Sequence, residues 1–398
     1  MANLKPSVNG LELGSRNTFL NSLEIRQYRA FQHLRIDHLG GVNLIVGKNS
    51  VGKSCLLEAL RLYAESGSSV ILRQLLEERD EAHGYNSRYY RDDKTYESDS
   101  ELFLLMKNIF HGRRNLLENP EPIHIGPLGN DEQTLKIAVS WFVEEIGEDR
   151  LRRLKRTEEP ILARQQTLFD FITESIDTPI PGLTFQIGHT IENSLPLRRI
   201  FDSRFIEPAK PHHLYVPAHG LDILKVGQLW DDITLTKFEK EVRQSLNIII
   251  PDIEGINIVG SAERSRERTA IVKLANVDEP VPIRSLGEGL NRIFGIVLAL
   301  VNAQNKIFLI DEIESGLHYS VQFELWKLIF EVAHRLNIQV FATTHSWDCV
   351  EAFQQAAAQN ESEEGVLIRL QQKNNTIVPT IFDEKKLTIA TREQIEIR

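Results

Sequence analysis

Residues 47–54 read GKNSVGKS and fit the pattern G-x-x-x-x-G-K-[ST] at every fixed position. In such a loop the glycines let backbone N–H groups turn toward phosphate oxygens, the lysine adds positive charge at the β and γ phosphates, and the final hydroxyl can ligate Mg²⁺. An apolar strand is expected before the loop at Val42–Val46, and helically spaced apolar residues predict a helix after it at Ser54–Ala64. A plain glycine turn at a helix start is the alternative, which the strand, loop and helix order disfavours. The predicted nucleotide ligands are Gly47, Asn49, Ser50, Gly52, Lys53 and Ser54.

A second apolar strand, expected from Lys306 to Ile310, ends in two adjacent carboxylates, Asp311 and Glu312. Parallel α/β sheets place their ligand groups at the carboxyl ends of strands. Asp311 therefore suits the Mg²⁺ shell, and Glu312 is placed to orient or deprotonate an attacking water. A solvated strand end is the competing interpretation, and the phosphate loop upstream favours the functional one.

Two further motifs lie near this strand. A strand from Ile338 ends in Thr344-His345-Ser346, which predicts that His345 shares a sheet edge with Glu312 and can sense a γ-phosphate. A structural histidine is the alternative. Ser285 and Gly287 open an apolar helix, where a serine N-cap and nearby glycines leave N–H groups free to bind an anion. Taken alone, that segment is simply a helix cap.

The composition describes an ordinary globular protein, with 398 residues, 41% of them hydrophobic and 26% charged. The formal net charge of −10 argues against coating nucleic acid by overall electrostatics, so any DNA contact must be local. Two basic stretches, Arg150–Arg156 and Arg264–Arg268, could touch a phosphate backbone. Solvated helix or loop faces are the favoured interpretation of both.

Cysteine and histidine usage indicates no structural zinc. The chain has two cysteines, Cys55 and Cys349, which are too few for a cysteine-based zinc framework and fit a reducing cytosol. His212, His213 and His219 lack a convincing fourth ligand and a matched spacing. Cys55 lies in the first turn of the expected helix, where a helix N-terminus can lower the pKa of a thiol, but packing is the favoured role.

No membrane segment is expected. The longest apolar run, Ile293–Val301, is far shorter than the roughly 20 residues that a spanning helix needs. The first ten residues do not resemble a signal peptide. We therefore expect a cytoplasmic protein.

The sequence predicts an α/β fold in five parts. A flexible leader covers residues 1–22, and an N-terminal lobe at 23–65 holds the phosphate loop and two antiparallel strands, Leu23–Tyr28 and Phe31–Ile36. Residues 66–210 form an inserted helical and β region with a turn at Pro179–Gly182. Residues 211–283 supply a strand, a helix and a hairpin, and residues 284–398 form the C-terminal lobe.

The order of these motifs resembles the ABC-type ATPases of the RecF, SMC and OLD group, and most of all the compact AAA/OLD-like ATPases of bacterial anti-phage systems. Six landmarks carry the resemblance: L-x-I-x-x-(Y/F)-R-x-F at Leu23–Phe31, the Walker A loop at 47–54, the S-x-G signature at Ser285 and Gly287, the Walker B pair Asp311 and Glu312, E-x-x-L-H at Glu314, Leu317 and His318, and T-H-S at Thr344–Ser346.

The resemblance implies an ABC-ATPase head that uses ATP and Mg²⁺. In this group the signature of one subunit covers the γ-phosphate held by another, so Ser285 and Gly287 would complete a site in a homodimer or a higher homo-oligomer. The signature lacks the fuller L-S-G-G-Q of transporters. OLD nucleases continue into a TOPRIM domain, whereas this chain ends about fifty residues after the T-H-S switch. These features predict an ATPase that controls a separately encoded effector in anti-phage defence. The alternative is a RecF-like DNA-repair or DNA-clamping ATPase, and a transporter cassette is disfavoured.

Overall fold

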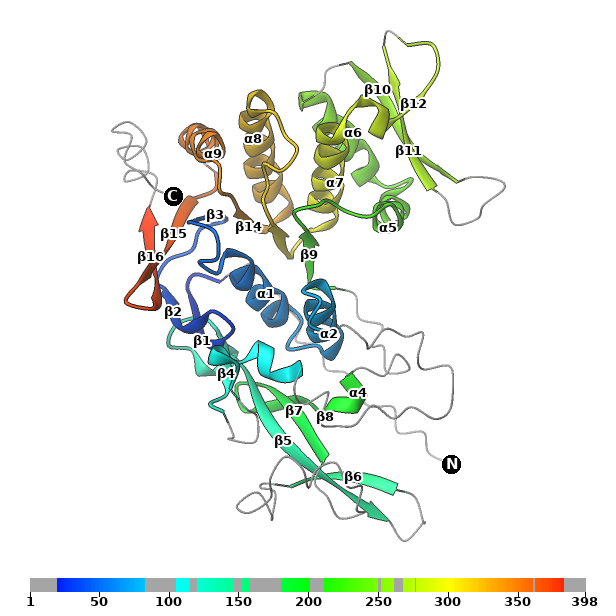
Figure 1. Ribbon diagram of the computed structural model, residues 1–398. Helices are drawn as coiled ribbons and strands as arrows, with labels where there is room; N and C mark the ends of the chain where they lie inside the picture. Colours follow the sequence, from blue (N-terminus) through cyan, green and yellow to red (C-terminus); the bar gives the residue numbers. More distant parts are fainter. Residues whose placement is uncertain are drawn as a thin grey trace.

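The computed structural model describes residues 20–82, 105–114, 120–146, 152–157, 180–200, 211–249, 252–260, 268–275, 277–360 and 362–382. Within these ranges the chain forms a mostly parallel central sheet, an antiparallel sheet and a small three-stranded sheet (Figure 1). Residues 1–19 of the predicted leader lie outside the described residues. Leu20 is buried, and its N–H donates to the Gln339 side chain at 3.0 Å. The chain therefore joins the fold slightly before residue 23.

The central sheet carries the strands that lead into the predicted motifs. Its order is β16-β15-β3-β14-β13-β9, with every neighbouring pair parallel except β15 and β16. The predicted strands before the phosphate loop, before Asp311 and before Thr344 are confirmed. The strands are β3 (Val42–Val46), β9 (His213–Val216), β13 (Ile307–Ile310), β14 (Gln339–Thr343), β15 (Gly365–Lys373) and β16 (Thr376–Phe382).

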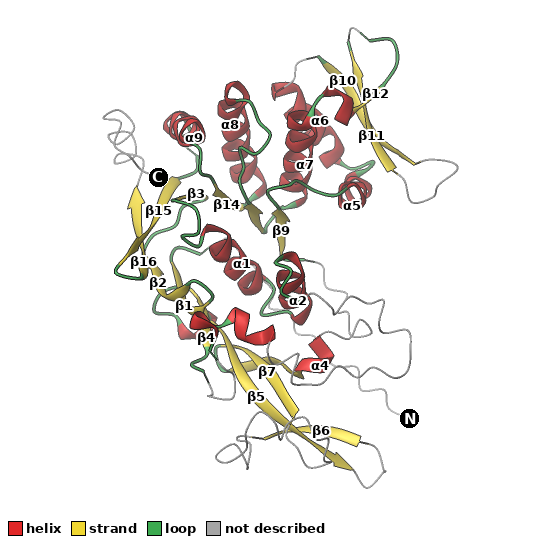
Figure 2. Ribbon diagram, in the orientation of Figure 1, coloured by secondary structure: helices red, strands yellow, loops and turns green. Residues whose placement is uncertain are grey.

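Helices cover both faces of this sheet, which explains why β3, β13 and β14 are buried along their whole length. Leu44 and Phe308 belong to the hydrophobic core under one helix group, and Ile45 and Leu309 belong to the core under the other. Figure 2 shows the first group, α7 to α9, on one side and α1 with α2 on the other. The helices are α1 (Lys53–Ala64), α2 (Ser69–Glu78), α7 (Glu288–Asn302), α8 (Tyr319–Leu336) and α9 (Trp347–Gln359).

The antiparallel sheet joins the N-terminal strands to strands that lie between residues 123 and 196. Its order is β2-β1-β4-β5-β7-β8, with β6 paired to β5. The predicted N-terminal pair is confirmed, with Leu23 opposite Ile36. The strands are β1 (Leu23–Tyr28), β2 (Phe31–Ile36), β4 (Ile123–Gly126), β5 (Leu135–Ile146), β6 (Arg152–Thr157), β7 (Ile180–Ile187) and β8 (Thr190–Pro196), and the short helix α4 (Leu197–Ile200) follows.

The turn predicted at Pro179–Gly182 is wrong from Ile180 onward, because β7 begins there. Gly182 pairs with Ser140 in the middle of the sheet. A Cβ atom on Gly182 would lie 2.3 Å from the carbonyl oxygen of Leu195, so this glycine permits close strand approach rather than a turn. Pro179 itself lies outside the described residues.

The basic run at 150–156 also differs from its predicted helix or loop, because residues 152–157 form the edge strand β6. The register of β5 and β6 places Arg153 opposite Glu145. Lys155 and Arg156 are exposed. The strand pairs antiparallel with β5, the strand directly before it in the chain, so the two form a hairpin that the run of basic residues did not indicate.

The connecting region contains one helix that the sequence pattern missed, α5 (Ile223–Ile233). The predicted helix and hairpin are confirmed as α6 (Lys237–Ile249) and as β10 (Ile253–Gly260) with β11 (Arg268–Leu274), next to β12 (Val281–Pro282). Arg268 forms an ion pair with Asp231 of α5 at 2.6 Å, so it is engaged within the fold. Arg264 and Arg266 lie outside the described residues. In the part of the chain that the structure describes, no helix has the length and apolar character needed to cross a bilayer.

A buried pair ties the end of α1 to the start of β9. Glu65 Oε1 lies 2.7 Å from His213 Nδ1 and accepts the backbone N–H of His212 at 2.6 Å. Burial lowers the pKa of His213 below its ordinary value, although Glu65 opposes this effect. Burial alone would raise the pKa of Glu65, but the hydrogen bond and charge of His213 outweigh it and lower that pKa. His213 thus has a structural partner.

We expect stability to fall as the pH is lowered from 7.5 to 5.5, with part of the loss due to His213. Its folded pKa is depressed, so below the ordinary value of 6.5 the unfolded chain takes up a proton that the folded chain resists. Each such proton changes stability by up to about 1.4 kcal/mol per pH unit. Urea unfolding gives the free energy of unfolding at each pH. A plot of that free energy against pH should be less steep for His213→Gln than for wild type. His189→Gln is the control, because His189 is 92% exposed. Equal slopes in wild type and His213→Gln would contradict this account.

Candidate functional site

The phosphate loop has a backbone that needs glycine at two places. Gly47 and Gly52 have φ values of 149° and 92°, and Ser50 has 65°. A Cβ atom on Gly47 would lie 2.6 Å from the carbonyl oxygen of Leu370, and one on Gly52 would lie 2.9 Å from the Phe31 ring. Larger residues would therefore displace the loop from the strands around it. Asn49 and Ser50 are exposed at its tip.

Lys53, the first residue of α1, folds back over this loop. Its Nζ donates to the carbonyl oxygens of Gly47 at 2.7 Å and Lys48 at 3.2 Å. Partial burial lowers the pKa of Lys53, while the carboxylates of Glu312 and Asp311 oppose the shift. The ammonium group is thus held at the loop by carbonyl contacts that a phosphate oxygen can replace.

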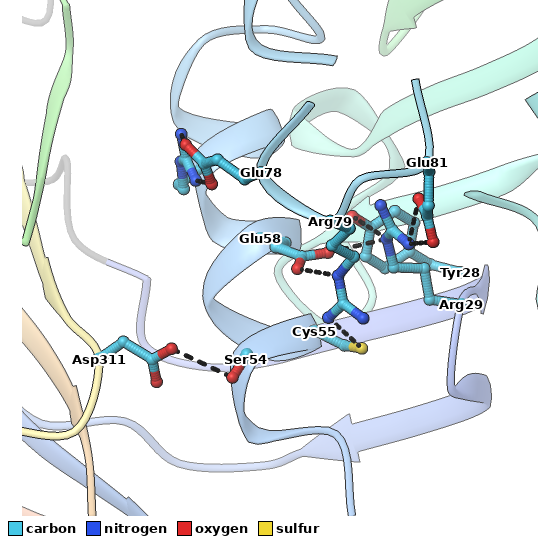
Figure 3. Close-up of polar contacts among 10 residues, drawn as sticks. Tyr28, Arg29, Ser54, Cys55, Glu58, Glu78, Arg79, Glu81 and Asp311 are labelled. Atoms are coloured by element: carbon cyan, nitrogen blue, oxygen red, sulfur yellow. Dashed lines mark hydrogen bonds and ion pairs between the residues drawn. The ribbon is translucent and has the colours of Figure 1, made fainter. Parts of the chain in front are cut away.

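Ser54 and Asp311 meet at the start of α1 (Figure 3). Ser54 Oγ donates to Asp311 Oδ2 at 3.1 Å, and Thr343 Oγ1 donates to the other carboxylate oxygen at 2.5 Å. A hydroxyl beside a carboxylate is the kind of oxygen donor set that Mg²⁺ prefers, so the two predicted metal ligands fit the ion. Thr343 was missed by sequence reasoning. Its position as the last residue of a strand beside Asp311 is the only signal for it.

Glu312 has an uncommon backbone conformation, with φ of 46°. Its N–H donates to Thr343 Oγ1 at 2.8 Å, which helps to hold this geometry. A non-glycine residue in this region costs on the order of 1 kcal/mol. The side chain is 42% exposed. Its carboxylate can therefore reach a ligand or water at the sheet edge.

His345 lies beside Glu312, as the strand order predicted. Its Nδ1 is 3.8 Å from Glu312 Oε1 and 3.1 Å from Glu314 Oε1. The ends of β13 and β14 are adjacent and parallel, which brings these residues from distant parts of the sequence to one edge. Glu314 was recognised only as part of the E-x-x-L-H turn.

The signature segment differs locally from its prediction. Ser285 is not the N-cap of the apolar helix, because it lies in a 3₁₀ helix at Ile283–Leu286 and Gly287 occupies the cap position. Gly287 has φ of 110°, which an L side chain rarely adopts, and this fixes where α7 begins. Ser285 and Gly287 are both exposed. Their surface is therefore accessible to another chain.

Arg292 links the signature helix to the two carboxylate residues, and sequence reasoning missed it. Its guanidinium donates to the backbone carbonyls of Asp311 at 2.8 Å, Glu312 at 3.2 Å and Pro217. Burial lowers the pKa of Arg292, although nearby carboxylates such as Asp311 oppose the effect. An arginine within an otherwise apolar helix face was the available signal.

A buried ionic cluster explains the N-terminal landmark (Figure 3). Glu58 of α1 lies 2.8 Å from Arg29 and 2.6 Å from Arg79, and it accepts the Tyr28 hydroxyl at 3.3 Å. Arg29 also donates to both carboxylate oxygens of Glu81 at 2.9 Å. The Tyr-Arg pair of the β1–β2 turn thus fixes the helix that carries Lys53. Removing one partner of such a buried network leaves an uncompensated charge.

Cys55 belongs to the same region and has a packing role. Burial raises the pKa of its thiol, with Glu58 adding to the effect, so the alternative of a lowered pKa is wrong. Arg79 contacts its Sγ at 3.3 Å. Arg61 of α1 further joins Glu78 of α2 at 2.5 Å.

Comparisons with known proteins find two family models that match this chain, and both models describe AAA-type domains. An "AAA domain" family model matches residues 22–102, which include the phosphate loop. An "AAA ATPase domain" model matches residues 229–350, which include the signature, Asp311, Glu312 and His345. Together with the geometry, these matches define the class. The chain is an ATP hydrolase with the α/β fold of a P-loop NTPase.

Over most of its length the chain is similar to an "ATP/GTP phosphatase" of Helicobacter pylori, with 26% identity over 384 residues that cover 91% of this chain and 95% of that protein. A 56-residue segment, 14% of this chain, is 46% identical to 15% of the DNA replication and repair protein RecF of Thioalkalivibrio sulfidiphilus. Among solved structures, a Pyrococcus furiosus Smc head domain bound to the C-terminal domain of ScpA matches with a TM-score of 0.47 and 9% identity, covering 94% of this chain and 99% of that one.

Proposed function

We propose that two copies of this chain close around ATP and that hydrolysis reopens the dimer. One observation carries the proposal. The loop and carboxylate residues gather at one sheet edge, whereas Ser285 and Gly287 are exposed at the start of α7. A pairing with twofold symmetry would place each signature over the site of the other chain.

In this proposal each residue at the sheet edge has a distinct role. Lys53 holds the β and γ phosphates, and Ser54 with Asp311 holds Mg²⁺, which would neutralise phosphate charge. Glu312 orients the attacking water and accepts its proton. His345 contacts the γ-phosphate and reports its presence.

Lys53→Ala should weaken ATP binding by about 10- to 100-fold, because charge-assisted contacts to phosphate are worth roughly 1.5–3 kcal/mol. Calorimetric titration with ATP and Mg²⁺ measures this loss directly. Lys48→Ala is the matched control, since Lys48 is an exposed lysine in the same loop. Affinity like wild type in Lys53→Ala would contradict the assignment of the loop lysine.

We further propose that the output of this switch is conformational and controls a separately encoded effector in anti-phage defence. The support is the resemblance of the motif set to AAA/OLD-like defence ATPases. Purification of the tagged native complex tests this proposal. We expect a second protein to bind wild type in a manner that depends on ATP, with less bound to Lys53→Ala. Recovery of the chain alone under both conditions would count against an effector.

The similarity to RecF supports a second candidate, a DNA-clamping ATPase. This candidate predicts DNA binding that strengthens with ATP and weakens with salt. The double variant Lys155→Glu with Arg156→Glu tests the exposed end of β6. Lys327→Glu, on the exposed face of α8, is its control. Binding that is equal in both variants would exclude β6 as a DNA contact.

A further inference from the structure

We propose that Glu314 is the positioning residue of His345, holding Nδ1 of the ring so that Nε2 is the nitrogen presented to a bound phosphate. This inference rests on the proposed role of His345. A single carboxylate oxygen, Glu314 Oε1, contacts two atoms of His345. It accepts the backbone N–H of His345 at 3.0 Å and lies 3.1 Å from the ring Nδ1. Two contacts to one oxygen constrain both the strand end and the ring.

The two neighbouring carboxylates differ in their suitability for this role. Glu312 Oε1 is farther from the same Nδ1, at 3.8 Å, and its side chain is 42% exposed. The Glu314 side chain is 8% exposed. Because water competes less with a buried contact, Glu314 orients the ring more firmly. Glu312 is then left free for the attacking water.

A carboxylate beside one ring nitrogen favours the tautomer of a neutral imidazole that carries its proton on that nitrogen. The nitrogen next to the carboxylate carries the proton, and the other nitrogen becomes the one available to a ligand. The His345 side chain is 54% exposed. The ring is thus fixed at Nδ1 and open toward the sheet edge.

The second oxygen of Glu314 supports a functional reason for this carboxylate. Glu314 Oε2 is buried and has no hydrogen-bond partner among the described residues. An unpaired buried polar atom costs roughly 1–3 kcal/mol, so stability alone does not favour a glutamate here. The contact with His345 accounts for its presence.

A double-mutant cycle on hydrolysis of bound ATP tests the proposal in the full chain. Single-turnover rates are measured for His345→Ala, Glu314→Ala and the double variant. We expect Glu314→Ala to slow the reaction about 10- to 100-fold, as loss of an orienting partner does elsewhere. The double variant should be no slower than His345→Ala within about twofold, because Glu314 acts through His345. If the double variant lost rate by the product of the two single losses, the proposal would be overturned.

Two controls separate this inference from the function on which it rests. A wild-type rate in His345→Ala would remove the proposed role of His345 itself, whereas multiplying losses would remove only the role of Glu314. Glu363→Ala is the matched variant, since Glu363 lies 3.2 Å from Nδ1 of His334 at the surface. It should leave the rate unchanged.

A spectroscopic measurement keeps the proposal testable even where Glu314→Ala folds poorly. The ¹⁵N shifts of the His345 ring, assigned by comparison with His345→Ala, should show a protonated Nδ1 in the neutral wild-type ring. Glu314→Gln, which keeps an acceptor oxygen, should retain this tautomer. A neutral ring protonated at Nε2 in wild type would overturn the proposal without any further variant.

Discussion

Replacing Glu312 with glutamine is expected to leave ATP binding within about threefold of wild type and to slow hydrolysis by about 10²- to 10⁴-fold, the usual contribution of a positioned general base. The physical reason is that different residues at the sheet edge bind the nucleotide and accept the proton. Lys53, Ser54 and Asp311 provide the proposed contacts to phosphate and metal, and the change leaves them intact. Glutamine keeps the shape of Glu312 but cannot accept the proton of the attacking water.

The measurement combines ATP affinity, single-turnover hydrolysis and molar mass by light scattering. We expect the Glu312→Gln chain to accumulate as a dimer with ATP, because closing proceeds and reopening does not. Glu331→Gln is the control, since Glu331 is an exposed glutamate on α8. Normal turnover in Glu312→Gln would assign the base to another group, and a monomer in saturating ATP would argue against closure around nucleotide.

The parts of the fold that local sequence predicted are those with strong local constraints. The phosphate loop fixes glycine positions through its backbone, and the fully apolar strands β3, β13 and β14 indicate a sheet covered on both faces. Parallel pairing then brings Glu312 and His345 to one edge, so their proximity followed from strand order.

The site residues that were missed depend on contacts between distant segments. Arg292, Thr343 and Glu314 act through partners on other elements, and no local pattern shows which carbonyl or ring each one meets. The strand β6 is local, since it forms a hairpin with β5, but its sequence RRLKRT lacks the alternation of apolar and polar residues that indicates a strand. Ser285 looked like an N-cap, and the positive φ of Gly287 moved the cap by two residues. Local propensity is a weak guide where tertiary contacts decide.

Ser285→Arg is expected to reduce the ATPase activity of the homodimer to background, although each chain keeps its own phosphate loop. Ser285 is exposed, so a larger side chain there should not disturb the fold of the single chain. In the closed dimer, however, the arginine would occupy the surface that faces the nucleotide of the other chain. ATP binding by the monomer should stay close to wild type.

Mixing Ser285→Arg with Lys53→Ala should restore activity that neither variant has alone. Each mixed dimer contains one site with an intact loop and an intact signature, and one site with both lesions. If chains pair at random, half the dimers are mixed and half of their sites are intact, so about a quarter of wild-type activity is expected. The control mixes Ser285→Arg with a chain that carries both changes, which leaves no intact composite site and should give no rescue. Recovery near a quarter in the first mixture alone would require that the signature works on the partner's nucleotide, whereas no recovery in either mixture, despite dimers being present, would place the complete site within one chain.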